Sequence, residues 1–138
     1  MEGKVTAVPL VVRNKAKSLE FFTERVGFEK KTDVTGPGGY RYVTVGPKGD
    51  RLEIAIWEVG SLTDPDQKSV SARWAPATTP PIVVAVDDCR KTHQELSGRG
   101  VEFPSPPSDH PWGVVATFRD PDGNLFSVSQ LKAGPPPK

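Results

Sequence analysis

With 138 residues, 36% hydrophobic and 25% charged, the chain has the size and composition of one globular domain, and its 15 prolines and 13 glycines argue against an all-helical protein. The formal net charge is +1 with both signs interspersed, so we expect neither a nucleic-acid partner nor a membrane partner. A single cysteine, Cys89, excludes an intrachain disulfide and a cysteine-cluster zinc site. This cysteine content, together with the lack of a predicted signal peptide, leads us to expect a cytoplasmic protein.

The first half of the chain predicts one helix and four strands. Residues 5–12 are apolar and partly β-branched, and they predict a strand that Pro9 would confine to a sheet edge or a bulge. Asn14 can cap a helix over residues 15–26, which Gly27 would end. The remaining strands are expected at 27–34 and, as a hairpin, at 40–46 and 50–57.

The strand at residues 51–57 has the clearest two-residue alternation in the chain. Leu52, Ile54 and Ile56 form an apolar face that we expect to pack under a helix. The other face mixes charged and aromatic side chains, which suits the wall of a pocket or a solvated sheet face. Its members are Arg51, Glu53, Ala55 and Trp57, and the preceding strand would add Tyr40, Tyr42 and Thr44.

The second half repeats this order after a linker at residues 59–79. We expect a strand at 81–86, a helix at 89–100 capped by Asp87 or Asp88, and strands at 101–103, 113–120 and 124–130. The sequence thus predicts an α+β domain, residues 1–132, built from two modules of the order strand, helix, three strands. Module one spans 5–58, module two spans 80–131, and a disordered tail spans 133–138.

Several stretches in these modules together resemble the vicinal oxygen chelate superfamily, which includes glyoxalases, bleomycin-resistance proteins and extradiol dioxygenases. They are SLEFFTERVGF after the first strand, VDD and GVEF in the second half, and RDPDGNLFSVSQ at the end, so that the resemblance covers about residues 5–130. It implies two βαβββ modules that form a curved eight-stranded cup, and a homodimer.

The resemblance also implies where a metal would be bound. Metal-dependent relatives such as glyoxalase I place one ligand on each of four strands, and the matching positions here are Ala7, Glu53, Pro81 and Ser127. Only Glu53 has a side chain that binds divalent metals well, and the neighbours Val8, Ile82 and Val128 are no better ligands. We therefore expect no metal and no other cofactor.

The two histidines and the cysteine give few further catalytic options. His93 and Cys89 fall on the predicted second helix, where we expect packed and chemically inert side chains. His110 is expected on a loop before a strand, where it could act as an acid, a base or a ligand donor. Glu53 and His110 are the only catalytic candidates.

Aromatic and polar residues on the inner strand faces indicate a pocket for a small molecule. In the last strand Leu125, Ser127 and Ser129 would face one side, and Phe126 and Val128 the other. The expected pocket residues are Tyr40, Tyr42, Thr44, Arg51, Glu53, Trp57, Trp112, Ser127 and Ser129.

Three functions remain open at this point. The first is a metal-free protein that sequesters a drug-like, aromatic or cationic ligand, as bleomycin-resistance proteins do. The second is a glyoxalase-like lyase, isomerase or dioxygenase with a non-standard metal site that uses Glu53. The third is an interaction domain with a vestigial cup.

Overall fold

The computed structural model describes residues 1–59 and 75–132. The chain divides into two compact units, Met1–Thr78 and Thr79–Lys138, which we call unit 1 and unit 2. Most of the expected linker, and all of the tail expected at 133–138, lie outside the described residues. No helix in the described ranges combines the length and apolarity that a membrane crossing needs.

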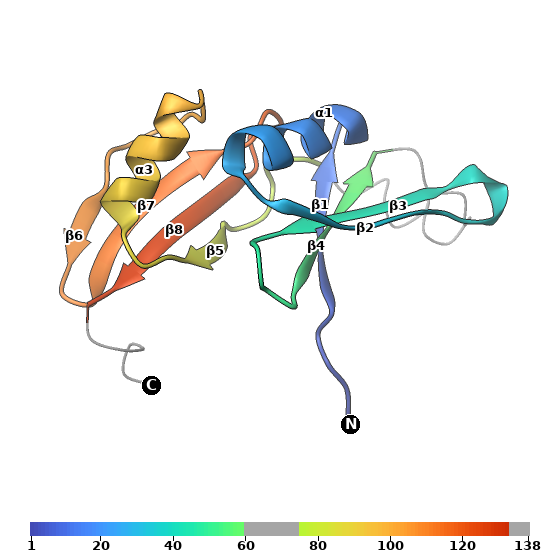
Figure 1. Cartoon of the computed structure of the whole chain (residues 1–138), viewed down its shortest axis with the longest axis horizontal. Helices are drawn as coiled ribbons and strands as arrows, with labels where there is room; N and C mark the ends of the chain where they lie inside the picture. The colour runs from blue at the N-terminus through green and yellow to red at the C-terminus, as the bar shows by residue number, and fades with distance from the viewer. Residues whose placement is uncertain (60–74, 133–138) are drawn as a thin grey trace. The chain divides into compact units, whose positions relative to one another are not determined.

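Unit 1 is a four-stranded mixed sheet with one helix along one of its faces (Figure 1). The strand order is β1-β4-β3-β2, with β1 parallel to β4 and the other pairs antiparallel. Pro9 therefore lies in an edge strand, which is the first of the two positions predicted for it. The elements are β1 (Ala7–Val12), α1 (Lys15–Glu20), a π-helical turn η1 (Phe21–Val26), β2 (Glu29–Thr35), a 3-10 turn η2 (Pro37–Gly39), β3 (Arg41–Gly46) and β4 (Glu53–Glu58).

Local sequence signals set the ends of this helix. The side chain of Asn14 accepts a hydrogen bond of 2.9 Å from the backbone N–H of Lys17, which caps α1. Gly27 ends η1 with φ of 85°, a backbone conformation that favours glycine. Both boundaries confirm the predicted helix at 15–26.

The buried face of this sheet follows the predicted alternation, with one exception. Ile54 and Ile56 are 5% and 1% exposed, and α1 contacts their strand, β4. The expected third member of this face, Leu52, is 37% exposed, so that prediction was wrong. Leu52 precedes β4 in the turn whose Asp50 N–H bonds Pro47 O, and there the pleat no longer sets the side-chain direction.

Unit 2 repeats the arrangement, with α3 along one face of a second four-stranded sheet (Figure 1). The order is β5-β8-β7-β6, with β5 parallel to β8 and the other pairs antiparallel. The elements are β5 (Ile82–Ala85), α3 (Cys89–Gly98), β6 (Ser108–His110), β7 (Gly113–Arg119) and β8 (Leu125–Leu131). Asp88 caps α3 by accepting the Lys91 N–H at 3.0 Å. Each unit is thus a βαβββ module, as the sequence predicted.

The sixth strand lies later in the chain than expected. Residues 101–103 form no strand, and only Glu102 makes an isolated bridge, to Arg119. Three prolines at positions 104, 106 and 107 follow at once, and none has an N–H to donate to a strand ladder. Continuous pairing with β7 therefore begins at Ser108.

The core of unit 2 is aromatic. The rings of Phe118 and Phe126 stack with centroids 5.2 Å apart, and Phe103 packs edge-on against Phe118 at 5.7 Å.

In the β7–β8 turn, the buried carboxylate of Asp120 accepts the N–H groups of Asp122 and Asn124 at 2.9 and 2.7 Å. The DPDGN stretch thus owes its composition to turn formation.

One buried group in α1 suggests a test of the packing. Ser18 is 1% exposed, and its Oγ has no hydrogen-bond partner among the described residues. Because burying an unsatisfied hydroxyl is unfavourable, we expect Ser18→Ala to raise the free energy of unfolding by about 1 kcal/mol. Urea denaturation measures this change, and the exposed Ser97→Ala in α3 controls for the higher helix propensity of alanine. A loss of stability in Ser18→Ala would contradict the expectation.

Candidate functional site

Each sheet has one face that its own helix does not cover, and the strand register assigns side chains to it. Paired residues on neighbouring strands point to the same side of a sheet. In unit 1, Ala7 pairs with Glu53, Val11 with Trp57 and Thr44 with Ala55. We call this side the helix-free face of unit 1; it carries Ala7, Pro9, Val11, Thr32, Val34, Tyr42, Thr44, Glu53, Ala55 and Trp57.

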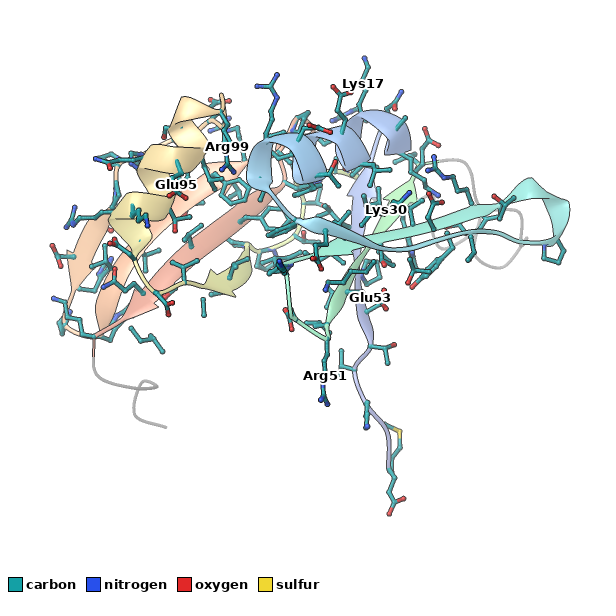
Figure 2. The ribbon with its side chains drawn as sticks, viewed as in Figure 1. Lys17, Lys30, Arg51, Glu53, Glu95 and Arg99 are labelled. Atoms are coloured by element: carbon teal, nitrogen blue, oxygen red, sulfur yellow. The ribbon has the colours of Figure 1, made fainter. Side chains whose placement is uncertain are left out.

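Glu53 is held in place on this face by two threonine hydroxyls. Its Oε1 accepts hydrogen bonds of 2.6 Å from Thr32 Oγ1 and 2.6 Å from Thr44 Oγ1. These two bonds favour the ionised form and lower the pKa of Glu53 below its usual value. The carboxylate is thus fixed in one position at the start of β4, where Figure 2 labels it.

Two of the residues expected beside Glu53 lie elsewhere. Arg51 is exposed in the turn before β4, and Figure 2 shows it pointing away from Glu53. Tyr40 precedes β3 and reaches α1, where Lys15 Nζ lies 4.5 Å from its ring centroid. Placing these two residues on the Glu53 face was wrong, because strand alternation does not extend into the turns that flank β3 and β4.

Tyr40 instead lines a hollow of about 390 Å³ together with Asn14, Lys15, Ala16, Gly39, Arg41 and Glu58. The Lys15 ammonium donates a hydrogen bond to the carbonyl oxygen of Arg41, and burial lowers the pKa of Lys15. Arg41 binds both carboxylate oxygens of Asp33, at 2.8 and 2.7 Å, and holds the pKa of Asp33 well below its usual range. These contacts connect α1 to β3 and β2.

The residues at the four metal positions do not fit a divalent metal. In unit 1 the neighbour of Glu53 across the strand pair is Ala7, which has no donor atom. In unit 2, Pro81 precedes β5, so that the neighbour of Ser127 is Val83. No group of three His, Cys, Asp or Glu side chains in residues 1–59 and 75–132 is arranged to hold a metal ion. One carboxylate and one hydroxyl do not make the donor set that such a metal needs.

The helix-free face of unit 2 carries a pocket of about 410 Å³. Strand pairing puts Ser127 and Ser129 of β8 beside Val83 and Ala85 of β5, and Val115 of β7 beside Ser129. The lining residues are Val83, Ala85, Trp112, Val115, Ser127, Ser129 and Leu131. Three of the predicted pocket residues, Trp112, Ser127 and Ser129, thus come together here.

The pocket wall is mostly apolar and open to solvent. Val83 is 68% exposed and Trp112 is 43% exposed, which is unusual for large hydrophobic side chains. Ser127 and Ser129 contribute hydroxyls to this wall, and Ser127 Oγ lies 3.3 Å from Thr117 Oγ1. Val83 and Ala85 lie on the side of the serines, as the alternation in β5 predicts, whereas Val115 and Leu131 were not predicted, although the alternation that predicted the serines extends to Leu131.

His110 lies next to this pocket and ends a strand, whereas a loop position was predicted. Its ring stacks on Trp112 with centroids 5.1 Å apart and an interplanar angle of 10°. Its Nε2 lies 3.0 Å from Ser108 Oγ. The register of β6 with β7 places both Ser108 and His110 on the helix-free face, beside Val115 and Gly113.

The other histidine and the cysteine are packed, as expected. The His93 ring meets Phe103 edge-on, with centroids 4.6 Å apart. Cys89 is 0% exposed, its Sγ donates to Val128 O at 3.4 Å, and burial raises the pKa of its thiol. The full burial of Cys89 keeps its thiol from chemistry, and the half-buried His93 ring is used in packing against Phe103.

Removal of one threonine hydroxyl tests the account of Glu53. In Thr44→Val, which keeps the shape of the buried side chain, we expect the pKa of Glu53 to rise toward its ordinary value, because the carboxylate loses one of two donors. NMR titration of the Glu53 carboxyl measures this shift. Thr35→Val, at the exposed end of β2, is the control, and an equal shift in both variants would contradict the assignment.

Comparison with known proteins finds a matching family model and relatives of similar length. The model of the Glyoxalase/Bleomycin resistance protein/Dioxygenase superfamily matches residues 4–128. YetH of Bacillus subtilis (strain 168) is 27% identical over 130 residues, which are 94% of this chain and 100% of YetH. YurT of the same organism is 29% identical over 135 residues, with 92% and 98% covered. Both relatives are described as uncharacterized.

Solved structures of similar fold also match nearly the whole chain. UcmS2 matches with a TM-score of 0.80 and 32% identity over 94% of this chain and 98% of UcmS2. A superfamily member from Sphaerobacter thermophilus DSM 20745 has a TM-score of 0.79 and 28% identity, with 94% and 98% covered. TnmS3, described as an antibiotic binding protein from Streptomyces sp. CB03234, has a TM-score of 0.75 and 27% identity, with 95% and 98% covered.

Proposed function

Because this chain belongs to the Glyoxalase/Bleomycin resistance protein/Dioxygenase superfamily, in which metal-dependent enzymes and drug-binding proteins share one fold, we propose that it binds a small aromatic molecule without a metal. The observation that carries the proposal is the pocket of unit 2, in which Trp112 exposes its ring beside an apolar wall. Its volume of about 410 Å³ suits a small molecule.

The chemistry of the wall favours a flat, mostly apolar ligand. Trp112 and the ring of His110 stacked on it offer an aromatic surface, and aromatic ligands gain from stacking as well as from burial. The hydroxyls of Ser127 and Ser129 provide hydrogen bonds for one polar group of the ligand. The likeness to TnmS3, an antibiotic binding protein, supports a ligand of drug-like size.

The helix-free face of unit 1 favours a positively charged or proton-donating group on a ligand. Glu53 Oε1 is occupied by two hydroxyls, whereas Oε2 has no hydrogen-bond partner among the described residues. The same face presents Trp57 and Tyr42, whose rings attract cations. We therefore keep Tyr42, Glu53 and Trp57 as proposed ligand contacts, whereas Thr44, which is 0% exposed, holds Glu53 in position and does not reach a ligand. The homodimer and the cytoplasmic location expected from the sequence stay predictions.

The role of Trp112 can be tested with Nile red, a neutral planar dye that fluoresces in apolar sites. We expect saturable binding to the purified protein, and about tenfold weaker binding to Trp112→Ala, because the dye loses its stacking partner and buried area. Fluorescence titration measures both affinities. Trp57→Ala removes a tryptophan outside the unit 2 pocket, on the face proposed for a cationic group, and should change the affinity for this neutral dye less. Unchanged binding to Trp112→Ala would argue against this pocket.

Metal analysis separates this proposal from the glyoxalase-like alternative. We expect protein purified without chelators to contain no stoichiometric nickel, zinc, manganese or iron by elemental mass spectrometry, because only Glu53 among the four family positions has a carboxylate. Glu53→Gln should give the same metal content as the native chain. A tightly held metal that is lost in Glu53→Gln would instead support an enzyme with a non-standard metal site.

A further inference from the structure

Strand β6 carries a serine and a histidine in direct contact. Ser108 and His110 are two residues apart on one strand, so that both side chains emerge on the helix-free face of unit 2. Ser108 Oγ lies 3.0 Å from His110 Nε2, within reach for proton transfer from the hydroxyl to the imidazole. Strand geometry alone brings this pair together, without any motif in the sequence.

The histidine of this pair is held in place by its neighbour. The His110 ring lies flat on the Trp112 ring at 5.1 Å and 10°, and the backbone of Trp112 is held by the Lys132 N–H, which donates to the Trp112 carbonyl oxygen at 3.0 Å. A nucleophile next to a base, with the base oriented by a third group, is the arrangement that activates serine in hydrolytic enzymes. Here an aromatic stack provides the orientation.

The pair also adjoins a place for the organic part of a substrate. Trp112 is shared between the His110 stack and the wall of the unit 2 pocket, so that an aryl group stacked in the pocket lies beside β6. In addition, β6 is the edge strand of its sheet, and an edge strand presents backbone N–H groups without a strand partner. Such groups can donate hydrogen bonds to a developing oxyanion.

We propose that Ser108 and His110 form a nucleophile and base pair that cleaves activated aryl esters through an acyl-serine intermediate. The position of the aryl group rests on the proposed function of the pocket, whereas the pair itself does not. No described residue accepts a hydrogen bond from the second ring nitrogen of His110, so we expect a modest acceleration, about 10²-fold over buffer.

The reaction needs no co-reactant other than water. Ser108 Oγ bonds to the ester carbonyl carbon while its proton passes to His110 Nε2, and the bond from that carbon to the aryl oxygen breaks. The departing aryl oxide takes the proton from His110, leaving acyl-Ser108 and neutral imidazole. Water then attacks the acyl carbon, gives a proton to His110, and the proton returns to Ser108 Oγ as the carboxylic acid leaves.

Hydrolysis of p-nitrophenyl acetate, followed by absorbance, tests the proposal together with peptide mapping of the acetylated protein. We expect turnover above buffer, acetyl on Ser108, and a loss of at least about tenfold in both Ser108→Ala and His110→Gln. Ser105→Ala, an exposed serine of the preceding loop, should retain full activity. Circular dichroism confirms that each variant is folded.

Three results would overturn the proposal. If Ser108→Ala keeps the activity that His110→Gln loses, the imidazole reacts alone and there is no pair. If the native chain does not exceed buffer, or carries acetyl elsewhere, Ser108 is not a nucleophile.

Nile red binding separates this inference from the proposed function. Ser108→Ala should bind the dye as the native chain does, because Ser108 does not line the pocket. Dye binding without esterase activity would reject the pair and leave the binding function standing. Acetylation of Ser108 without dye binding would reject the pocket and support the pair.

Discussion

Each sheet buries one face under a single helix, and this requirement determines much of the rest of the molecule. Because side chains alternate along a strand, every residue that packs under the helix places its neighbours on the opposite face. Phe126 and Val128 are buried on the helix side of β8, so that Ser127 and Ser129 must lie on the helix-free side. The hydrophobic core thereby also sets the position of the polar groups.

The same alternation determines which residues meet on each helix-free face. In unit 1 it aligns Glu53 with two threonine hydroxyls, which keep the carboxylate ionised and in one position. In unit 2 it aligns small and hydroxyl side chains, which leave a hollow beside Trp112. Glu53 belongs to no group of side chains that could hold a metal ion among the described residues, and the hollow of unit 2 is apolar with an exposed ring. Both features suit ligand recognition better than metal chemistry.

Side-chain directions were predictable from the sequence inside regular strands and not in the turns next to them. The two-residue alternation in β4 correctly predicted the burial of Ile54 and Ile56. The same alternation was wrongly continued to Leu52, which lies before the strand and is exposed. The same extension placed Tyr40 beside Glu53, whereas it lies against Lys15 of α1. A turn breaks the pleat, and the direction of a side chain beyond that point depends on turn dihedrals that no period describes.

The sequence by itself determined the two βαβββ modules, the ends of the first helix and the poor donor set at the metal positions, since all of these depend on local periodicity, capping and residue type. Only the tertiary structure decided which side chains touch. The stack of His110 on Trp112 and its bond to Ser108 depend on where β6 begins to pair with β7, and three prolines delay that start. Pairing register joins residues from different strands, and it is set by packing across the whole sheet rather than by any one segment.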